Sequence, residues 1–224
     1  IMKAVILAAG EGKRLRPLTL ATPKPLLKVR GKPILEHTFN NLPDAVREII
    51  LVIGYKGEQI KDYFGEEFGG RKIYYVEQLE LKGTFHALFC AKSLLGNYPF
   101  LCLVGDDFYK KEDLDRLVSE PSAVLVYETS NPERFGICRI NQEGFLEEII
   151  EKPQYPRGNL ANTGACILDG MIFEEPVVYG HGGEELLAPM LGSLAKKRPV
   201  KSVLGSFWLP IGYLEDLKKA ENIL

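Results

Sequence analysis

The stretch that decides the fold is an apolar run leading into a glycine-rich turn, Ala4-Val5-Ile6-Leu7-Ala8-Ala9-Gly10-Glu11-Gly12-Lys13-Arg14. Six consecutive apolar residues are expected for a strand that is buried on both faces of a parallel sheet. The glycines of the turn let backbone N–H groups approach an anion closely. The stretch therefore predicts a buried strand of an α/β sheet, followed by a turn that can hold an anion.

Strand-like and helix-like stretches alternate through the first half of the chain. Strands are expected at 48–54, 72–76 and 100–104, and helices at 33–42, 58–64 and 84–95. The last helix is expected to bury Phe85, Leu88, Phe89 and Leu95 on one side. This alternation predicts a doubly wound, mostly parallel, Rossmann-like α/β sheet with right-handed crossovers.

Beyond residue 120 the pattern becomes strand-rich. Strands are expected at 123–127, 136–140, 145–151 and 165–168, and a closing helix at 214–224. We interpret these strands as an antiparallel extension of the same sheet. Because no linker or internal repeat interrupts the chain, we expect a single domain over residues 2–224. Ile1, which precedes the first methionine, is left out of these expectations.

The composition is that of an ordinary globular protein, with 46% hydrophobic residues, 26% charged residues and a net charge of −2. The apolar runs have the length of strands, far below a membrane span, and no signal-peptide pattern precedes them. The four cysteines lie far apart among apolar neighbours, which indicates buried thiols in a reducing compartment. We therefore expect a cytoplasmic protein without general affinity for nucleic acid or membrane, and a homo-oligomer stays open.

The charges are distributed unevenly. Residues 1–32 carry eight lysines and arginines against one acidic residue, Glu11, although the whole chain is slightly acidic. A basic segment on an acidic body indicates a local site for a small polyanion. The alternative is a solvated charged loop without a ligand.

The glycine-rich turn does not match the two common phosphate loops. A dinucleotide fingerprint needs a third glycine where Leu15 stands, and a Walker loop needs Gly-Lys-Ser/Thr after four spacer residues. The segment instead supplies cations, including Arg14 and Lys24, and Lys24 lies between two prolines that restrict its backbone. A positioned cation is what phosphoryl or nucleotidyl transfer requires.

The long pattern resembles the signature of the sugar-phosphate nucleotidylyltransferases: Leu7-Ala8-Ala9-Gly10-x-Gly12-x-Arg14-Leu15-x-Pro17-Leu18-Thr19, then Pro23-Lys24-Pro25-Leu26. That family has a glycosyltransferase-A-like α/β fold. It couples a nucleoside triphosphate to a sugar 1-phosphate and releases pyrophosphate. The resemblance implies the same reaction here, with UTP or dTTP and, by default, glucose 1-phosphate as the two substrates.

The resemblance also implies roles for single residues. Arg14 would bind the phosphates being released, and Lys24 would stabilise charge at the α-phosphate. Gln78 and Gly83-Thr84 would read a pyrimidine base, and Asp106 would hold Mg²⁺. The remaining nucleotide-binding residues would be Leu7, Ala8, Ala9, Gly10, Gly12 and Lys13. The sugar phosphate would be held by Phe135, Gly136, Glu151, Lys152 and Asn162.

Each of these residues also has a structural interpretation. Gly10 and Gly12 are suited to a tight turn, and Asp106 to a helix cap. Gln78 fits a surface amide, and Glu151-Lys152 an exposed ion pair. The three histidines have no metal-ligand spacing and are expected to be structural, and Trp208 is expected to anchor the core.

One position departs from the family pattern. Many members carry Trp-x-Asp-x-Gly near the C-terminus, whose aspartate is a second magnesium ligand, whereas this chain has Trp208-Leu209-Pro210-Ile211-Gly212. Proline cannot bind a metal. Either Mg²⁺ relies on Asp106, phosphates and water, with Asp107 as a helper, or the metal site is weakened. Two alternative functions stay open. Pro210 suggests a non-catalytic nucleotide-sugar sensor, and the same fold with another acceptor would give a phosphocholine-type cytidylyltransferase.

Overall fold

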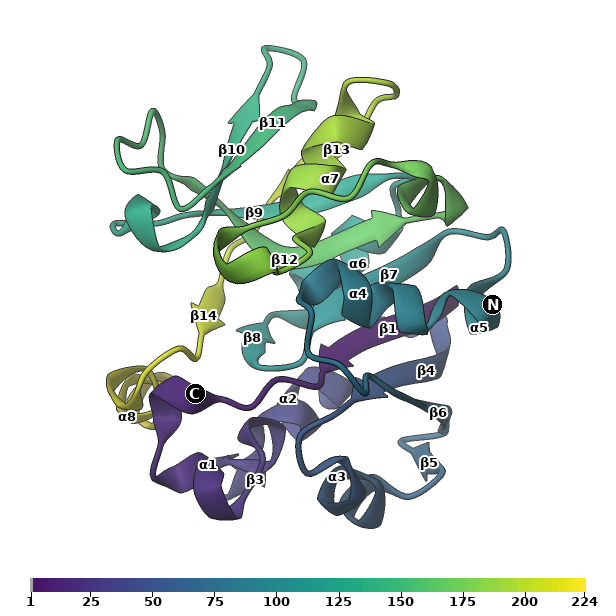
Figure 1. Ribbon diagram of the computed structural model, residues 1–224, viewed down its shortest axis with the longest axis vertical. Helices are drawn as coiled ribbons and strands as arrows, with labels where there is room; N and C mark the ends of the chain where they lie inside the picture. Colours follow the sequence, from purple (N-terminus) through teal and green to yellow (C-terminus); the bar gives the residue numbers. More distant parts are fainter. Residues whose placement is uncertain (1) are drawn as a thin grey trace.

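A mixed α/β sheet of ten strands runs through the computed structural model, which describes residues 2–224 (Figure 1). Strand β1 (Met2–Ala8) lies between β7 (Phe100–Val104) and β4 (Val46–Ile53), and β6 (Arg71–Glu77) follows β4; all these pairings are parallel. The short edge strand β5 (Glu67–Phe68) pairs antiparallel with β6. The apolar run at the start of the chain thus forms a strand in the middle of the parallel block, as the sequence predicts.

The strand-rich second half extends the same sheet, which confirms the predicted antiparallel extension. Strand β12 (Leu160–Leu168) pairs antiparallel with β7, and β10 (Gly136–Ile140) joins β12 to β11 (Leu146–Glu151). Strand β9 (Ala123–Glu128) also pairs with β12 and carries β13 (Lys201–Leu204) in parallel. Strand β12 begins five residues before its predicted start, with a register irregularity between Asn162 and Cys166.

The sheet is covered on both faces because alternate residues of its strands enter two different cores. In β1, Ala4, Ile6 and Ala8 belong to one core, and Val5 and Leu7 to the other. The first core is covered by α2 (Ile34–Asn40), α3 (Gly57–Phe64) and α6 (Lys111–Val118). The second is covered by α4 (Thr84–Cys90), α5 (Lys92–Leu95) and α7 (Leu187–Ala195), and Figure 1 shows α4 and α5 in front of the sheet. This is the doubly wound arrangement that the sequence predicts.

The predicted single helix over 84–95 is wrong in two respects. The structure divides it into α4 and α5 at Ala91, and Phe89 is 47% exposed although the sequence pattern placed it in the core. Successive helical residues are about 100° apart, so Phe89 points well away from the buried Leu88. Phe89 instead packs against Phe173 at the rim, with their ring centroids 6.1 Å apart.

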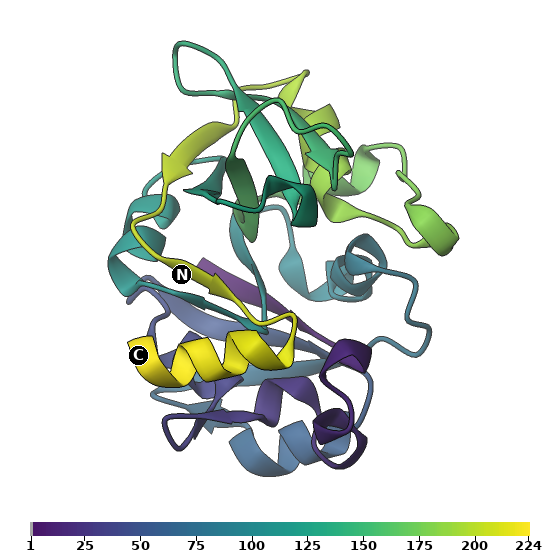
Figure 2. The same cartoon turned by 90° about the vertical axis from the view of Figure 1, so that its left-hand side faces the viewer.

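The C-terminal segment returns to the N-terminal half of the molecule. Strand β14 (Trp208–Pro210) pairs antiparallel with β8 (Asp107–Tyr109), which directly follows β7. Helix α8 (Leu214–Ile223) then packs beside the small sheet of β2 (Lys28–Val29) and β3 (Lys32–Pro33), and α1 (Leu18–Ala21) lies nearby (Figure 2). A third core joins these pieces through Leu15, Ile34, Phe108 and Leu209.

The cysteines are distributed between the core and its margin. Cys102, Cys138 and Cys166 are buried as expected, whereas Cys90 is half-buried. Across residues 2–224, no helix combines the length and the apolar character needed to cross a membrane.

Candidate active site

Two adjoining cavities open at the carboxyl ends of β1, β6 and β7, where ligands bind in open α/β sheets. One has a volume of 500 Å³ and the other 590 Å³, and Lys24 and Asp106 line both. The three loops that follow these strands, at 10–24, 77–83 and 105–107, meet here as the sequence predicts. Every residue proposed for the nucleotide, the sugar phosphate or the metal lines one of the two cavities or both.

The 500 Å³ cavity, which we call the nucleotide cavity, gathers the residues proposed for the triphosphate and the base. They come from the end of β1, the turn after it, the 3-10 turn that begins at Lys24, the loop after β6 and the start of α4. The members are Leu7, Ala8, Ala9, Gly10, Gly12, Lys13, Arg14, Lys24, Gln78, Gly83 and Thr84.

Glycine stands at the two positions of the turn for different reasons. Gly12 has a φ of +63°, and a Cβ there would lie 2.9 Å from Thr19 Cγ2, so the turn itself requires glycine. The Gly12 carbonyl also accepts a hydrogen bond from the Thr19 hydroxyl at 2.9 Å. A Cβ at Gly10 would meet no atom within 4 Å in the part of the chain that the structure describes. Gly10 therefore leaves open space beside the nucleotide cavity, while Gly12 shapes the turn.

Lys24 lies at the junction of the two cavities. Its side chain is 10% exposed, and its ammonium group forms an ion pair with the Asp106 carboxylate. Lys24, which lies between Pro23 and Pro25, is the first residue of a 3-10 turn, Lys24–Leu26. The cation and the carboxylate that the sequence assigned separately are thus direct neighbours.

The next residue, Asp107, also lines the 590 Å³ cavity but is only 7% exposed. Its carboxylate accepts a hydrogen bond from Trp208 Nε1 at 2.9 Å, which satisfies the one polar atom of this buried ring. Burial and the neighbouring Asp106 charge raise the pKa of Asp107 well above its usual value, and Lys24 and the Trp208 bond oppose this only in part. Asp107 is therefore a less available ligand than Asp106, whose side chain is 35% exposed.

The donor set fits a magnesium ion that keeps most of its oxygen ligands from phosphate and water. Within residues 2–224, no cluster of three histidine, cysteine or acidic residues is arranged to hold a metal. Pro210 stands opposite Asp107 in the β8–β14 pair and lines the 590 Å³ cavity, at the place where an aspartate would add a second carboxylate. Magnesium is often held by one or two carboxylates together with substrate phosphates, so the exposed carboxylate of Asp106 is the candidate protein ligand here.

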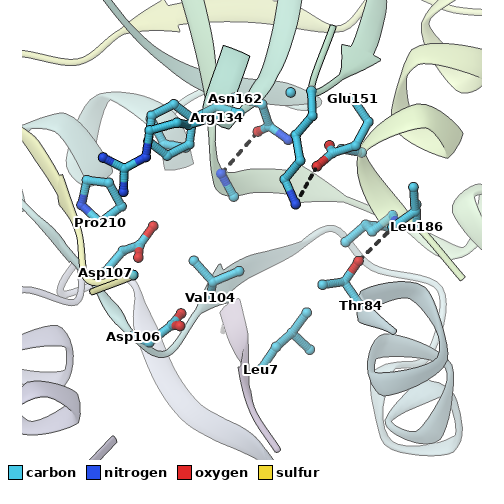
Figure 3. A pocket seen from close by; sticks show the side chains of 18 of the residues that line it. Leu7, Thr84, Val104, Asp106, Asp107, Arg134, Glu151, Asn162, Leu186 and Pro210 are labelled. Carbon is cyan, nitrogen blue, oxygen red and sulfur yellow. Dashed lines mark hydrogen bonds and ion pairs between the residues drawn. The ribbon is translucent and has the colours of Figure 1, made fainter. Parts of the chain in front are cut away.

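The 590 Å³ cavity, which we call the sugar cavity, gathers Phe135, Gly136, Glu151, Lys152 and Asn162. Figure 3 shows Glu151 and Asn162 on its wall. Glu151 and Lys152 are 3.7 Å apart, and burial raises the pKa of Glu151 against the opposing charge of Lys152. A Cβ at Gly136 would lie 3.0 Å from Glu151 Oε2, so glycine leaves room for this carboxylate. Asn162 Oδ1 accepts the Gly164 N–H at 3.0 Å, and Phe135 packs edge-on against Trp208.

Sequence reasoning missed an aromatic-cation group at the mouth of the sugar cavity. The guanidinium groups of Arg14 and Arg134 each lie 5.0 Å from the ring centre of Tyr213. The Tyr213 pKa is lowered by Arg14. Asp216 fixes the backbone there by accepting the N–H groups of Gly212 and Tyr213, each at 2.8 Å. The sequence held one signal for this group, a cation directly before the Phe135-Gly136 pair.

Comparisons with known proteins show what the whole chain is similar to. Residues 3–224 match the family described as nucleotidyl transferase. The chain is 36% identical over 238 residues to the UTP–glucose-1-phosphate uridylyltransferase AglF of Haloferax volcanii, covering 100% of this chain and 96% of AglF. It is 38% identical over 226 residues to the bifunctional protein GlmU of Methanocaldococcus jannaschii, but spans about half (54%) of that protein.

Solved structures share the fold over the whole chain. A Bacillus anthracis protein described as a glucose-1-phosphate thymidylyltransferase superimposes with a TM-score of 0.87 at 26% identity, covering 100% of this chain and 95% of that one. A UDP-glucose pyrophosphorylase with bound UDP-glucose gives 0.86 at 25% identity, covering 99% and 97%. With the match over residues 3–224, this shows that the chain belongs to the nucleotidyl transferase family.

Proposed function

We propose that this chain transfers a nucleotidyl group from UTP or dTTP to a sugar 1-phosphate, with glucose 1-phosphate as the first candidate, and releases pyrophosphate. The observation that carries the proposal is the Lys24–Asp106 ion pair at the junction of two cavities. The reaction joins two phosphates, so its centre must lie where their two binding sites meet. The names of AglF and of the two solved structures support the same substrate class.

In the nucleotide cavity, the backbone of the Gly10–Gly12 turn would surround the triphosphate. Arg14 would bind the β- and γ-phosphates that leave as pyrophosphate, and Lys24 would bind the α-phosphate. The ion pair with Asp106 holds the Lys24 ammonium at the junction, so little reorganisation is needed when charge develops on the α-phosphate.

In the sugar cavity, Lys152 would bind the 1-phosphate and Glu151 would accept hydrogen bonds from sugar hydroxyls. The Phe135 ring and the adjacent Gly136 would lie along the sugar ring, and Asn162 would contact its far side. Lys152 has a φ of +41°, an uncommon backbone conformation for a residue other than glycine. Such conformations often occur at ligand sites, which supports a binding role for this turn.

Asp106 would hold Mg²⁺ together with phosphate oxygens, and the ion would neutralise part of the triphosphate charge. The carboxylate lies at the end of β7, between the two cavities and beside Lys24. Hard oxygen ligands of this type suit magnesium.

The reaction itself is an in-line displacement. An ionised oxygen of the sugar 1-phosphate attacks the α-phosphorus, a new P–O bond forms, and the bond to the bridging oxygen of the β-phosphate breaks. The electron pair leaves with pyrophosphate, and no general base is needed because the attacking oxygen carries no proton. Alignment of the two phosphates can lower such a barrier by roughly 7–11 kcal/mol.

We also propose that residues 2–224 act as one nucleotidyltransferase domain in the cytoplasm. Both large cores contain residues of β1 and residues of the antiparallel extension, which supports a single cooperative unit. The buried thiols of Cys102 and Cys166 lie opposite each other in the β7–β12 pair without forming a disulfide, which suits a reducing compartment.

The test is pyrophosphate release with Mg²⁺ across a panel of triphosphates and sugar 1-phosphates, for the parent and Lys24→Met. Methionine keeps the length of the side chain and removes the charge. We expect UTP or dTTP to be used with a hexose 1-phosphate, and Lys24→Met to lower kcat about 100-fold to 1,000-fold. Nucleotide binding without turnover by any pair would favour the sensor, and turnover of CTP with phosphocholine would favour the cytidylyltransferase.

A further inference from the structure

The amide of Gln78 is held in one orientation by the protein. Gln78 follows β6, is 5% exposed and lines the nucleotide cavity. Its terminal nitrogen lies 3.1 Å from the carbonyl oxygen of Gly83. A carbonyl oxygen can only accept, so the amide must present its NH₂ group there, and the reverse orientation would bring two oxygens together.

His86 engages the second hydrogen of the same NH₂ group. The Gln78 nitrogen lies 3.1 Å from His86 Nδ1, which must therefore be the unprotonated ring nitrogen, with the ring proton on Nε2. Both hydrogens of the amide are then used inside the protein. The sequence interpretation of His86 as purely structural did not include this contact.

The remaining polar atom of the amide is Oε1, a hydrogen-bond acceptor. Within residues 2–224, no group donates a hydrogen bond to Oε1. Only two buried side-chain atoms in this range lack a partner, one in Glu175 and one in Arg198, so Oε1 is not fully buried. It therefore keeps accessible surface, and the openings that Gln78 lines are the nucleotide cavity and a neighbouring hollow behind the same loop. The amide thus offers an acceptor to a ligand.

The position of His86 is fixed by the start of α4. Gly83 precedes this helix with a φ of +110°, and a Cβ there would lie 2.5 Å from the carbonyl oxygen of Glu185. The Phe85 N–H donates to the same Glu185 oxygen at 3.0 Å, and the Leu187 N–H donates to Thr84 Oγ1 at 3.0 Å. The first turn of α4 is therefore anchored to the 185–187 segment, and His86 cannot easily move away from Gln78.

We infer that His86 is a positioning residue that sets the base preference of this site by fixing the Gln78 oxygen toward the nucleobase. The inference rests on the proposed function. A free glutamine amide can rotate and serve a donor or an acceptor equally, and His86 removes that choice. The fixed oxygen accepts the N3–H of uracil or thymine, whereas cytosine presents an unprotonated N3 that repels it.

The experiment compares His86→Leu, which removes the acceptor, with His86→Asn, whose Oδ1 can take the place of Nδ1. KM and kcat are measured for UTP and CTP by pyrophosphate release, and binding of both nucleotides is measured by calorimetry. We expect His86→Leu to raise the KM for UTP about tenfold, to affect kcat less, and to reduce the UTP/CTP preference about tenfold, the effect of one hydrogen bond. His86→Asn should restore most of the preference.

Cys90→Ala is the matched control, because Cys90 Sγ lies 4.0 Å from the same Nδ1 without contacting Gln78. It should keep the UTP/CTP preference of the parent. The parent is also titrated with 3-methyl-UTP, which lacks the N3–H, so that one result does not depend on the folding of a variant. We expect it to bind at least about tenfold more weakly than UTP.

An unchanged UTP/CTP ratio in His86→Leu, or equal binding of UTP and 3-methyl-UTP, overturns the inference. A parent enzyme that turns over CTP in preference to UTP also overturns it, while leaving an active nucleotidyltransferase. Conversely, if no substrate pair reacts but UTP binding still shows this dependence on His86, the inference stands and the proposed catalytic function fails.

Discussion

Pro210 lies directly opposite Asp107 in the two-stranded sheet formed by β14 and β8. The pairing places residue 210 beside Asp107, the first residue of β8, and on the wall of the sugar cavity. An acidic side chain here would complete a pair of outward carboxylates with Asp106. Proline leaves the proposed magnesium site with less negative charge and constrains the strand that carries it.

Pro210→Asp should therefore strengthen magnesium binding. We expect the Mg²⁺ concentration for half-maximal activity to fall about tenfold, because affinity for such ions follows the number of charged ligands. Without Mg²⁺ the added charge should lower the Tm, since burial and the Asp106 charge already raise the pKa of Asp107. Thermal unfolding with and without Mg²⁺ measures this independently of turnover. Pro210→Asn removes the proline without adding charge, and equal behaviour of the two variants would contradict the prediction.

The two glycines of the turn should respond differently to alanine. Gly12→Ala forces a residue with a side chain to a φ of +63° and against Thr19, so we expect a loss of about 1–2 kcal/mol in the free energy of unfolding. Gly10→Ala places its methyl group in open space and should leave the Tm unchanged while weakening triphosphate binding about tenfold. Thermal unfolding and nucleotide titration of both variants separate the effects. A large decrease in the Tm of Gly10→Ala would contradict the prediction and show that Gly10 is needed for the fold.

Glu151→Gln should raise the Tm at neutral pH and weaken binding of the sugar 1-phosphate. Burial raises the pKa of Glu151, so its ionised form costs stability in the folded state. This cost is absent at acid pH, develops as the pH rises from the ordinary pKa of a glutamate to the raised pKa, and is complete above it. The variant should thus have a slightly higher Tm than the parent at neutral pH and the same Tm at low pH, together with a higher KM for the sugar 1-phosphate. A variant that is less stable than the parent at neutral pH would show that Lys152 compensates the burial.

Asp113 should increase the free energy of unfolding at neutral pH and lose this contribution in acid. It is 1% exposed, and its carboxylate accepts the N–H groups of Ser206 and Phe207 at 2.8 and 3.1 Å and a bond from Arg116 at 2.7 Å. Burial raises the Asp113 pKa, but the hydrogen bonds from Arg116, Ser206 and Phe207 together lower it by more, so the net shift is downward. A depressed folded pKa contributes stability that is present above about pH 4 and is lost as the pH falls.

Asp113→Asn should accordingly cost about 1–3 kcal/mol at neutral pH and less under acid conditions. Urea unfolding of the parent and the variant across this pH range measures the difference. A pH-independent gap between the two curves would mean that the carboxylate charge does not stabilise the fold. Asp115→Asn, a change on the exposed side of the same helix, is the matched control.

The parts of the fold that followed from the sequence are those where one local pattern decides the structure. The run from Ala4 to Ala9 has no polar residue that could face water, so its burial in a parallel sheet was predictable. The exposure of Phe89 was not, because helical spacing alone does not say where the covered stripe ends. That boundary depends on where the second layer, including Phe173, lies on the helix.

The site divides in the same way. The Gly10–Lys24 segment is continuous, so its cations could be interpreted together before the fold was known. Arg134 and Tyr213 are far apart in the chain and meet only because β14 returns to β8. The contact between His86 and Gln78 depends on side-chain geometry at the start of α4, which sequence spacing does not specify.

The β8–β14 pairing has a consequence for synthesis on the ribosome. The chain from Met2 to Asp107 already contains the nucleotide turn, Gln78 and both aspartates, but the partner of β8 begins at Trp208. At about 5–20 residues per second, roughly 5–20 seconds separate the translation of Asp107 from that of Pro210. A nascent chain must therefore carry its clustered aspartates and an unpaired β8 through this interval, and the wall of the sugar cavity closes only near the end of translation.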